Sequence, residues 1–394
     1  MNFQLLKNFM DHLTAEIVPG NAVCVYVRGQ EVFRYASGYA DMENRIPMTG
    51  DELLNIYSCS KVATAVAAAQ LVEQGRILIN DPLCDYLPEY RQMQVRQPDG
   101  TTAPAKQLIR IGDLFGMTAG FDYNLRSPAH KKAKMQTNGA MDTVTVARCM
   151  AENPLLYEPG TGWEYSLAHD VLAAVVSVVS GMKFRDYVQR NIFEPLDIWD
   201  AHYHRTPEVE ARMAQQYRLC PRNAPELDSV AAQRGRQTRN GVIVNVGPSV
   251  GSFVPGPEYD SGGAGIIVSV PEYAKLAAAL ANGGLGANGQ RILSPATVRL
   301  MHTDRLTTAT RSGYNWEHLQ GYGYGLGVRT LVDPAAAGAL SPVGEFGWGG
   351  AAGATLLADT RYGVGVFYAH HMLNPQEWYY QPRLRNVVYA ALEA

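Results

Sequence analysis

A serine and a lysine three residues apart, Ser58 and Lys61, open a segment whose apolar residues recur with helical spacing. Side chains three apart on a helix lie on one face. The segment is rich in alanine and carries no charge between Lys61 and Glu73, which predicts a helix that is buried on most sides and ends near Gly75. The sequence therefore places a hydroxyl beside an amine at a helix N-terminus, where backbone N–H groups can bind an anion.

A Ser-x-x-Lys pair is a weak signal by itself, and this chain contains two of them. The second pair, Ser180 and Lys183, comes after a long apolar run and is interrupted by Gly181, so Ser180 is predicted to end a helix. Ser58 instead begins one. Only Ser58 therefore has the context of a nucleophile.

A serine hydroxyl needs a partner that removes its proton before it can attack. An amine can do this only when burial or nearby positive charge lowers its pKa from about 10.4, and Lys61 is placed for that role. Tyr165, in a loop just before a predicted helix, is a candidate to return the proton. Taken alone, Tyr165 is more simply explained as one packed tyrosine among 22.

The stretch 247–251 is a rival nucleophile site, because it matches Gly-x-Ser-x-Gly and follows a strand-like run at 242–246. A nucleophile elbow of this kind must continue directly into a helix. Pro255 and Pro257 follow instead and disfavour that helix. We expect a turn here and no catalytic role for Ser249.

The glycine-rich stretch 346–353 surrounds Trp348. Glycines permit close backbone approach, and the indole supplies a large apolar wall. A tight hairpin with a packed tryptophan explains the pattern, and so does a substrate-lining strand whose N–H groups bind an oxyanion. The pattern alone leaves both interpretations open.

The arrangement of predicted strands and helices indicates how the chain is organised. Two strands near the start form a hairpin, helices dominate the middle, and strands return near the end. The predicted helices of the middle are 111–117, 144–150, 167–180 and 184–192, and the predicted strands are 22–27, 32–36, 322–328, 354–358 and 364–368. This order predicts an α+β fold whose sheet is built from both chain ends, with the two termini close together. We expect a discontinuous sheet domain over 1–83 and 255–394, and a mainly helical inserted domain over 84–254.

Composition narrows the function classes. A net charge of −3 over 394 residues argues against a nucleic-acid or anionic-membrane partner. The five cysteines are scattered, which excludes a disulfide framework or a metal knuckle and suits a reducing compartment. The N-terminus reads as an amphipathic helix and not as a signal peptide, and no apolar run reaches about 18 residues. We predict a cytoplasmic protein with no metal site; the oligomeric state, including a homo-oligomer, stays open.

Three motifs in order, Ser58-x-x-Lys61, Tyr165-Ser166-Leu167 and Trp348-Gly349-Gly350, resemble those of the class C β-lactamase and penicillin-binding superfamily. The closest resemblance is to its family VIII carboxylesterases. Further stretches that support it are 81–88, 111–114, 118–120, 158–160 and 261–265. The resemblance implies a β-lactamase-like antiparallel sheet flanked by helices, beside an all-α region, with the site between them.

The resemblance also implies the roles of individual residues. Ser58 would be the acylated nucleophile, and Lys61 and Tyr165 would exchange its proton. The N–H groups of Ser58 and Ala351 would form the oxyanion hole. Tyr123 looks like the site-facing tyrosine of the esterase group. Neither a metal nor an organic cofactor is implied.

The substrate-binding positions implied by the resemblance are Tyr123, Trp348, Gly349 and Gly350. The chain departs from the lactamase pattern twice: Leu167 replaces an asparagine, and Trp348 replaces a lysine. Both replacements remove polar groups that hold an amide or a carboxylate. We therefore predict a serine hydrolase that cleaves short-chain carboxylic esters through an acyl-enzyme. A β-lactamase or D-amino-acid peptidase is the alternative, followed by an acyltransferase or a catalytically silent penicillin-binding-like protein.

Overall fold

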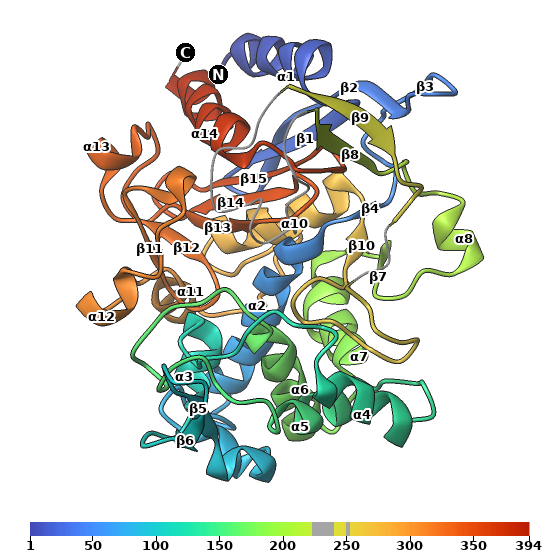
Figure 1. Ribbon diagram of the computed structural model, residues 1–394. Helices are drawn as coiled ribbons and strands as arrows, with labels where there is room; N and C mark the ends of the chain where they lie inside the picture. The colour runs from blue at the N-terminus through green and yellow to red at the C-terminus, as the bar shows by residue number, and fades with distance from the viewer. Residues whose placement is uncertain (223–239, 250–252, 394) are drawn as a thin grey trace.

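One antiparallel sheet joins the two ends of the chain in the computed structural model, which describes residues 1–222, 240–249 and 253–393 (Figure 1). In spatial order its eight strands are β11 (Tyr322–Tyr324), β12 (Arg329–Leu331), β13 (Phe346–Gly349), β14 (Thr355–Asp359), β15 (Val364–Ala369), β1 (Gly20–Val27), β2 (Gln30–Asp41) and β3 (Ile46–Pro47). The predicted 22–27 and 32–36 hairpin is confirmed. The predicted strand over 322–328 is too long, because the chain turns at Gly327 with φ +76°.

The strand β1 reads as an unbroken apolar run because both of its faces are covered. Val23 and Val25 pack with α1 (Gln4–Glu16) and α14 (Glu377–Glu393), while Cys24 on the other face packs in the core that contains α10 (Val270–Ala281). β1 pairs with β15 from the far end of the chain. The N–H of Asn2 donates to the carbonyl of Ala391 at 2.8 Å, so the termini lie together as predicted.

Helices fill the half of the molecule away from this sheet (Figure 1). They are α2 (Ser60–Glu73), α3 (Ile111–Gly116), α4 (Pro128–Gln136), α5 (Thr143–Met150), α6 (Ala168–Ser180) and α7 (Phe184–Val188). The predicted helices near 111, 144 and 167 are confirmed to within two residues, and the one predicted from 184 to 192 ends as an α-helix at Val188. Every residue of α2 from Ser60 to Leu71 is buried, as its alanine-rich sequence indicates.

Shorter elements connect these parts. The short helices are α8 (Pro207–Glu210), α11 (Pro295–Met301), α12 (Thr308–Arg311) and α13 (Pro334–Ala337), with single turns η1 (Tyr57–Cys59), η2 (Leu83–Asp85), η3 (Pro88–Gln92), η4 (Gln189–Phe193), η5 (Glu194–Leu196) and η6 (Glu317–Leu319). Three small sheets pair β4 (Leu54–Asn55), β10 (Ile267–Val268) and β7 (Ala201–His202); β16 (Met372–Leu373), β8 (Tyr217–Pro221) and β9 (Gly241–Asn245); and β5 (Gln94–Arg96) with β6 (Thr102–Pro104).

The chain enters the helical half through β4 and leaves it before β10, and these two short strands pair with each other. The proposed domain boundaries at 83/84 and 254/255 stay a prediction. Among the described residues, no helix combines the length and the apolar character that crossing a membrane requires.

Candidate active site

Ser58 lies in η1, a single turn between β4 and α2, and not in α2 itself, which begins at Ser60. Tyr57, directly before it, adopts a left-handed backbone conformation with φ +44°, which costs a non-glycine residue about 1–3 kcal/mol. Side-chain contacts hold the turn in place. Tyr57 donates its hydroxyl to Gln216 at 2.9 Å, and the Cys59 thiol donates to the carbonyl of Trp348 at 3.2 Å.

Lys61 brings its amine to this turn from the first turn of α2. Its Nζ lies 3.4 Å from Ser58 Oγ, 3.5 Å from the Tyr123 hydroxyl, and donates to the carbonyl of Gly263 at 2.8 Å. It also lies 4.6 Å from the centre of the Tyr165 ring. Burial lowers the pKa of Lys61 from 10.5 to about 7, and attraction to Asp170 opposes this only in part. A large fraction of this amine is therefore neutral near neutral pH and can accept a proton.

Asp170 is a site residue that the sequence analysis missed. A Cβ added to Gly263 would lie 2.5 Å from Asp170 Oδ2 and 3.2 Å from Lys61 Nζ, so a glycine is needed between the carboxylate and the amine. Asp170 Oδ1 accepts from Tyr259 at 2.9 Å and from Ser261 at 2.8 Å. The glycines of the 261–265 stretch, which passes over α2, were the one signal of such close packing in the sequence.

Tyr165 precedes α6 and points its hydroxyl at the nucleophile. Its hydroxyl interacts with Ser58 and accepts from Trp348 Nε1 at 3.1 Å, and the Trp348 and Tyr165 rings stack at 5.6 Å. Burial raises the pKa of Tyr165 well above its ordinary value of 10, so the phenol keeps its proton. The Tyr123 ring stacks on Tyr165 at 5.7 Å, and its hydroxyl accepts from Lys61 at 3.5 Å and also interacts with Ser58. The structure therefore brings Tyr165, Tyr123 and Trp348 together beside Ser58 and Lys61.

Strand β13 carries Trp348 and ends against the nucleophile turn. A Cβ added to Gly350 would lie 2.2 Å from the carbonyl of Ile56, two residues before Ser58, which explains the glycine by close backbone approach. Ala351 packs with Tyr57 in one apolar cluster. This geometry suits the expected oxyanion hole of Ser58 and Ala351, which stays a prediction. Trp348 is packed among aromatic rings, as the interpretation of a packed tryptophan expects, and the substrate-lining interpretation of the 346–353 stretch stays a prediction.

The rival serine stands elsewhere. Ser249 Oγ donates to Asn55 at 3.4 Å, whereas residues 250 and 251 of its motif lie outside the described residues. Ser58, in contrast, has an amine of lowered pKa and two phenols around its hydroxyl. This arrangement can activate a serine and pass its proton on, which is the chemistry of acyl transfer.

Comparison with known proteins identifies the family to which the chain belongs. The Beta-lactamase family model matches residues 4–390. Esterase EstB of Burkholderia gladioli is 31% identical over 357 residues, which cover 88% of this chain and 84% of that protein. The structure of EstCE1, "a hydrolase with promiscuous acyltransferase activity", aligns with a TM-score of 0.75 at 25% identity over 98% of both chains. The structure of a family VIII carboxylesterase has the same fold, with a TM-score of 0.72 at 18% identity over 99% of this chain and 97% of that one.

The resemblance drawn from the three motifs is therefore confirmed, and so is the α+β fold that it implied. The match extends over nearly the whole chain and is not limited to the motifs. The chain belongs to the β-lactamase family, within the β-lactamase-like superfamily of serine hydrolases.

Proposed function

We propose that the protein hydrolyses short-chain carboxylic esters through an acyl-enzyme on Ser58. The observation that carries this proposal is the buried Lys61 amine, with its lowered pKa, 3.4 Å from Ser58 Oγ. Similarity to EstB, named an esterase, and to EstCE1, titled a hydrolase, supports ester substrates.

In the proposed reaction, Lys61 accepts the hydroxyl proton as Ser58 Oγ forms a bond to the ester carbonyl carbon. The N–H groups of Ser58 and Ala351 stabilise the negative charge that develops on the carbonyl oxygen. As the ester bond breaks, Tyr165 gives its proton to the leaving alkoxide and regains one from Lys61. A water molecule then attacks the acyl-enzyme by the same route and releases the acid.

The activity should depend on pH in a way that identifies Lys61. Because a protonated amine cannot accept the Ser58 proton, we expect kcat/KM for a neutral ester to rise with pH and to level off above about 7. Tyr165 stays protonated throughout this range, since burial raises its pKa. Initial rates from about pH 5 to about pH 9, corrected for spontaneous hydrolysis, measure this. If kcat/KM kept rising with pH up to the pKa of an exposed lysine, Lys61 could not be the group that titrates.

Trp348 should set the choice between esters and β-lactams. It stands where lactamases carry a lysine, so a substrate carboxylate brought to β13 would lose water without gaining a charged partner. We expect at least ~10²-fold lower kcat/KM for a chromogenic cephalosporin than for p-nitrophenyl butyrate. Equal rates on the two substrates would favour the lactamase or peptidase alternative.

The variant Trp348→Lys tests the cause of that difference and should narrow it. Trp348→Phe is the matched control, because it keeps an apolar ring without adding a cation. Trp348 is packed among aromatic rings, so thermal unfolding of both variants must be compared with the wild type. A gap that Trp348→Phe narrows as much as Trp348→Lys would exclude the missing cation as the cause.

Acyl transfer is the second candidate, and similarity to EstCE1, a hydrolase with promiscuous acyltransferase activity, favours it. An alcohol acceptor added to the ester assay distinguishes the two functions. A hydrolase releases free acid at an unchanged yield, whereas a transferase converts the acyl group into the new ester. Gas chromatography of the products measures that partition.

A further inference from the structure

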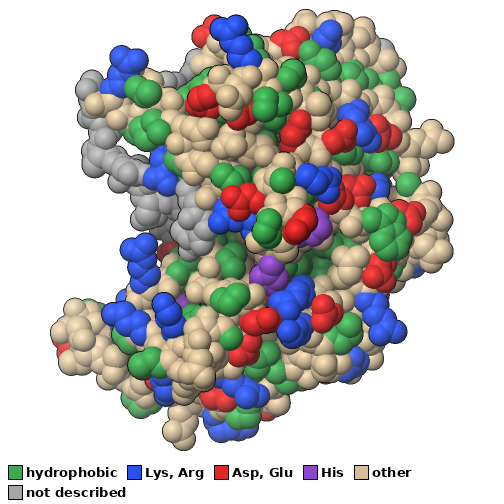
Figure 2. Space-filling model, turned by 90° about the vertical axis from the view of Figure 1, so that its right-hand side faces the viewer, with side chains coloured by type: hydrophobic (Ala, Val, Ile, Leu, Met, Phe, Trp, Pro, Cys, Tyr) green, Lys and Arg blue, Asp and Glu red, His purple; other side chains and the backbone are tan. Residues whose placement is uncertain are grey.

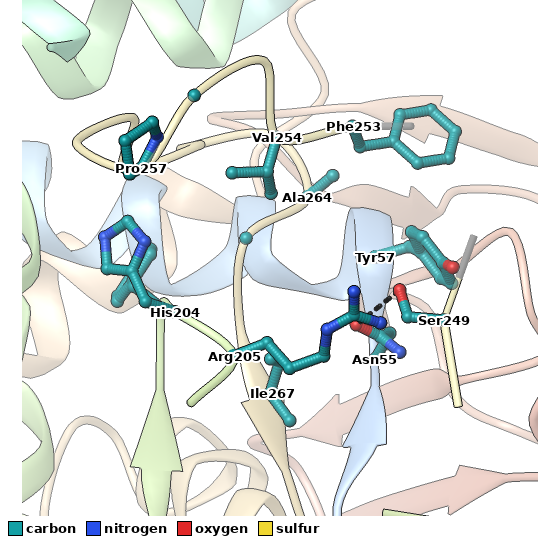
Figure 3. Close-up of a pocket in the computed structure, with 13 residues that line it drawn as sticks. Asn55, Tyr57, His204, Arg205, Ser249, Phe253, Val254, Pro257, Ala264 and Ile267 are labelled. Carbon is teal, nitrogen blue, oxygen red and sulfur yellow. Dashed lines mark hydrogen bonds between the residues drawn. The ribbon is translucent and has the colours of Figure 1, made fainter. Parts of the chain in front are cut away.

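A cavity of about 410 Å³ opens beside the nucleophile turn (Figure 3). The residues of its lining used below are Asn55, Tyr57, Arg205, Ser249, Phe253 and Ala264. The face that carries β7 and α8 is hollowed near its middle, with histidine, basic and acidic side chains at the rim (Figure 2). The volume is within the range of small-molecule sites.

Three lining residues connect this cavity to the proposed catalytic groups. Tyr57 directly precedes Ser58, and Ala264 directly follows Gly263, whose carbonyl binds Lys61. The Phe253 ring lies 5.2 Å from the Tyr57 ring and 6.2 Å from the Tyr123 ring. One part of a substrate held at Ser58 can therefore extend into the cavity.

Arg205 gives the cavity its charge. It is the one residue of permanent charge among the described lining residues, and none of them is a carboxylate. Figure 3 shows its side chain extending towards the end of the cavity formed by Asn55, Tyr57 and Ser249. His204, also in the lining, hydrogen-bonds with Asp260 at 2.8 Å, so it already has an acidic partner.

Among the residues that the structure describes, Glu210 is the acidic partner of Arg205, and this pair leaves most of the guanidinium donors available. Its Nε lies 3.3 Å from Glu210, and the two side chains are 37% and 49% exposed, so this pair is weak and screened by solvent. A guanidinium has five N–H donors in a planar fork that matches a carboxylate. In contrast, the neighbouring polar groups are occupied, because Asn55 donates to Pro248 and Tyr57 donates to Gln216.

We propose that this cavity binds an anionic group of the ester substrate, a carboxylate, through Arg205, so that the preferred substrates are half-esters or esters of an acidic alcohol. This inference rests on the proposed esterase function. Figure 1 places β13 and the β7–β10 pair on opposite sides of the start of α2. Trp348 replaces the lysine of the lactamase pattern on one side of Ser58, and Arg205 would supply a cation on the other side.

Matched ester pairs that differ only in charge test this proposal. For an anion on the acyl side, the pair is the p-nitrophenyl monoester of adipic acid and its methyl ester. For an anion on the alcohol side, it is 4-carboxyphenyl butyrate and its methyl ester. We expect the acid to exceed its methyl ester in kcat/KM by about tenfold in one of the two pairs, and added salt to reduce that ratio.

Arg205→Gln should lower that ratio to about one or below, and Arg205→Lys should restore part of it, because a lysine keeps the charge without the planar fork. Arg212→Gln is the matched control: Arg212 is an exposed arginine paired with Asp200 outside this cavity, and its loss should leave the ratio unchanged. Glu210→Gln should raise the ratio by removing the competing carboxylate. Thermal unfolding confirms that each variant is folded.

Two outcomes overturn the inference. One is a wild-type ratio at or below one in both pairs; the other is a ratio that Arg205→Gln and Arg212→Gln change equally. Either result leaves the proposed function intact as long as the methyl esters are hydrolysed. If the wild type hydrolyses no ester of either pair, the proposed function itself fails.

Discussion

Ser58→Ala is expected to abolish ester turnover, with a loss on the order of 10⁴- to 10⁶-fold in kcat, because Ser58 carries the acyl intermediate in the proposed reaction. The hydroxyl is small and lies in a turn held by Tyr57 and Cys59, so the fold should not change. Initial rates with p-nitrophenyl butyrate measure the loss. Labelling by a fluorophosphonate probe, followed by peptide mapping, identifies the modified serine directly.

The matched control is Ser249→Ala, which removes the serine of the rival motif. Ser249 donates to Asn55, and its loss would leave Ser58 and Lys61 in place, so most of the activity should remain. The assignment would be wrong if Ser249→Ala abolished turnover and Ser58→Ala did not. A wild-type protein that neither turns over esters nor takes up the probe would favour the catalytically silent alternative.

Removing either proton carrier should have the second-largest effect. Tyr165→Phe keeps the ring and deletes only the hydroxyl, and we expect kcat to fall on the order of 10²- to 10⁴-fold with little change in KM. Lys61→Met removes the amine and keeps most of the volume, and its loss should be at least as large. Lys61→Met should also eliminate the rise in activity near pH 7, because the group that titrates there is gone.

Tyr165→Phe should also lower the stability of the protein, and a control variant must separate this effect from the loss of activity. The hydroxyl accepts the buried Nε1–H of Trp348, and leaving that donor without a partner costs about 1–3 kcal/mol of stability. Activity must therefore be measured well below the unfolding temperature. Tyr123→Phe is the matched variant: its hydroxyl accepts from Lys61 at 3.5 Å, but Lys61 also donates to the carbonyl of Gly263 and keeps that partner, so Tyr123→Phe should be more stable than Tyr165→Phe. Unchanged kcat in Tyr165→Phe would show that Lys61 acts alone.

Features with a local cause could be predicted from the sequence. The buried α2 follows from its run of alanines, and the meeting of Ser58 with Lys61 follows from a spacing of three residues at the start of a helix. The hairpin of β1 and β2 follows from alternating β-branched and aromatic residues. The order of the three motifs was sufficient to indicate the family, because each motif is short but their joint order is specific.

The properties that make the site reactive depend on residues far apart in the chain. Lys61 owes its lowered pKa to complete burial, and its closest acceptor, the carbonyl of Gly263, is 202 residues away. Asp170 reaches the same amine across that glycine, and no periodicity in the sequence marks it. The left-handed backbone of Tyr57 is held by Gln216, 159 residues along the chain.

The cavity lined by Arg205 could not be predicted from the sequence either. Its lining comes from β4, from the segment after β7 and from the 253–267 region, and a cavity exists only where such segments are packed together. Spacing along a helix or strand determines which neighbours share a face, and the sequence by itself determined the nucleophile and its first partner in this way. Desolvation, electrostatic attraction and the shape of a binding site depend on distances through space. Only the tertiary structure therefore decided how far the pKa of Lys61 is lowered and what the site can hold beside Ser58.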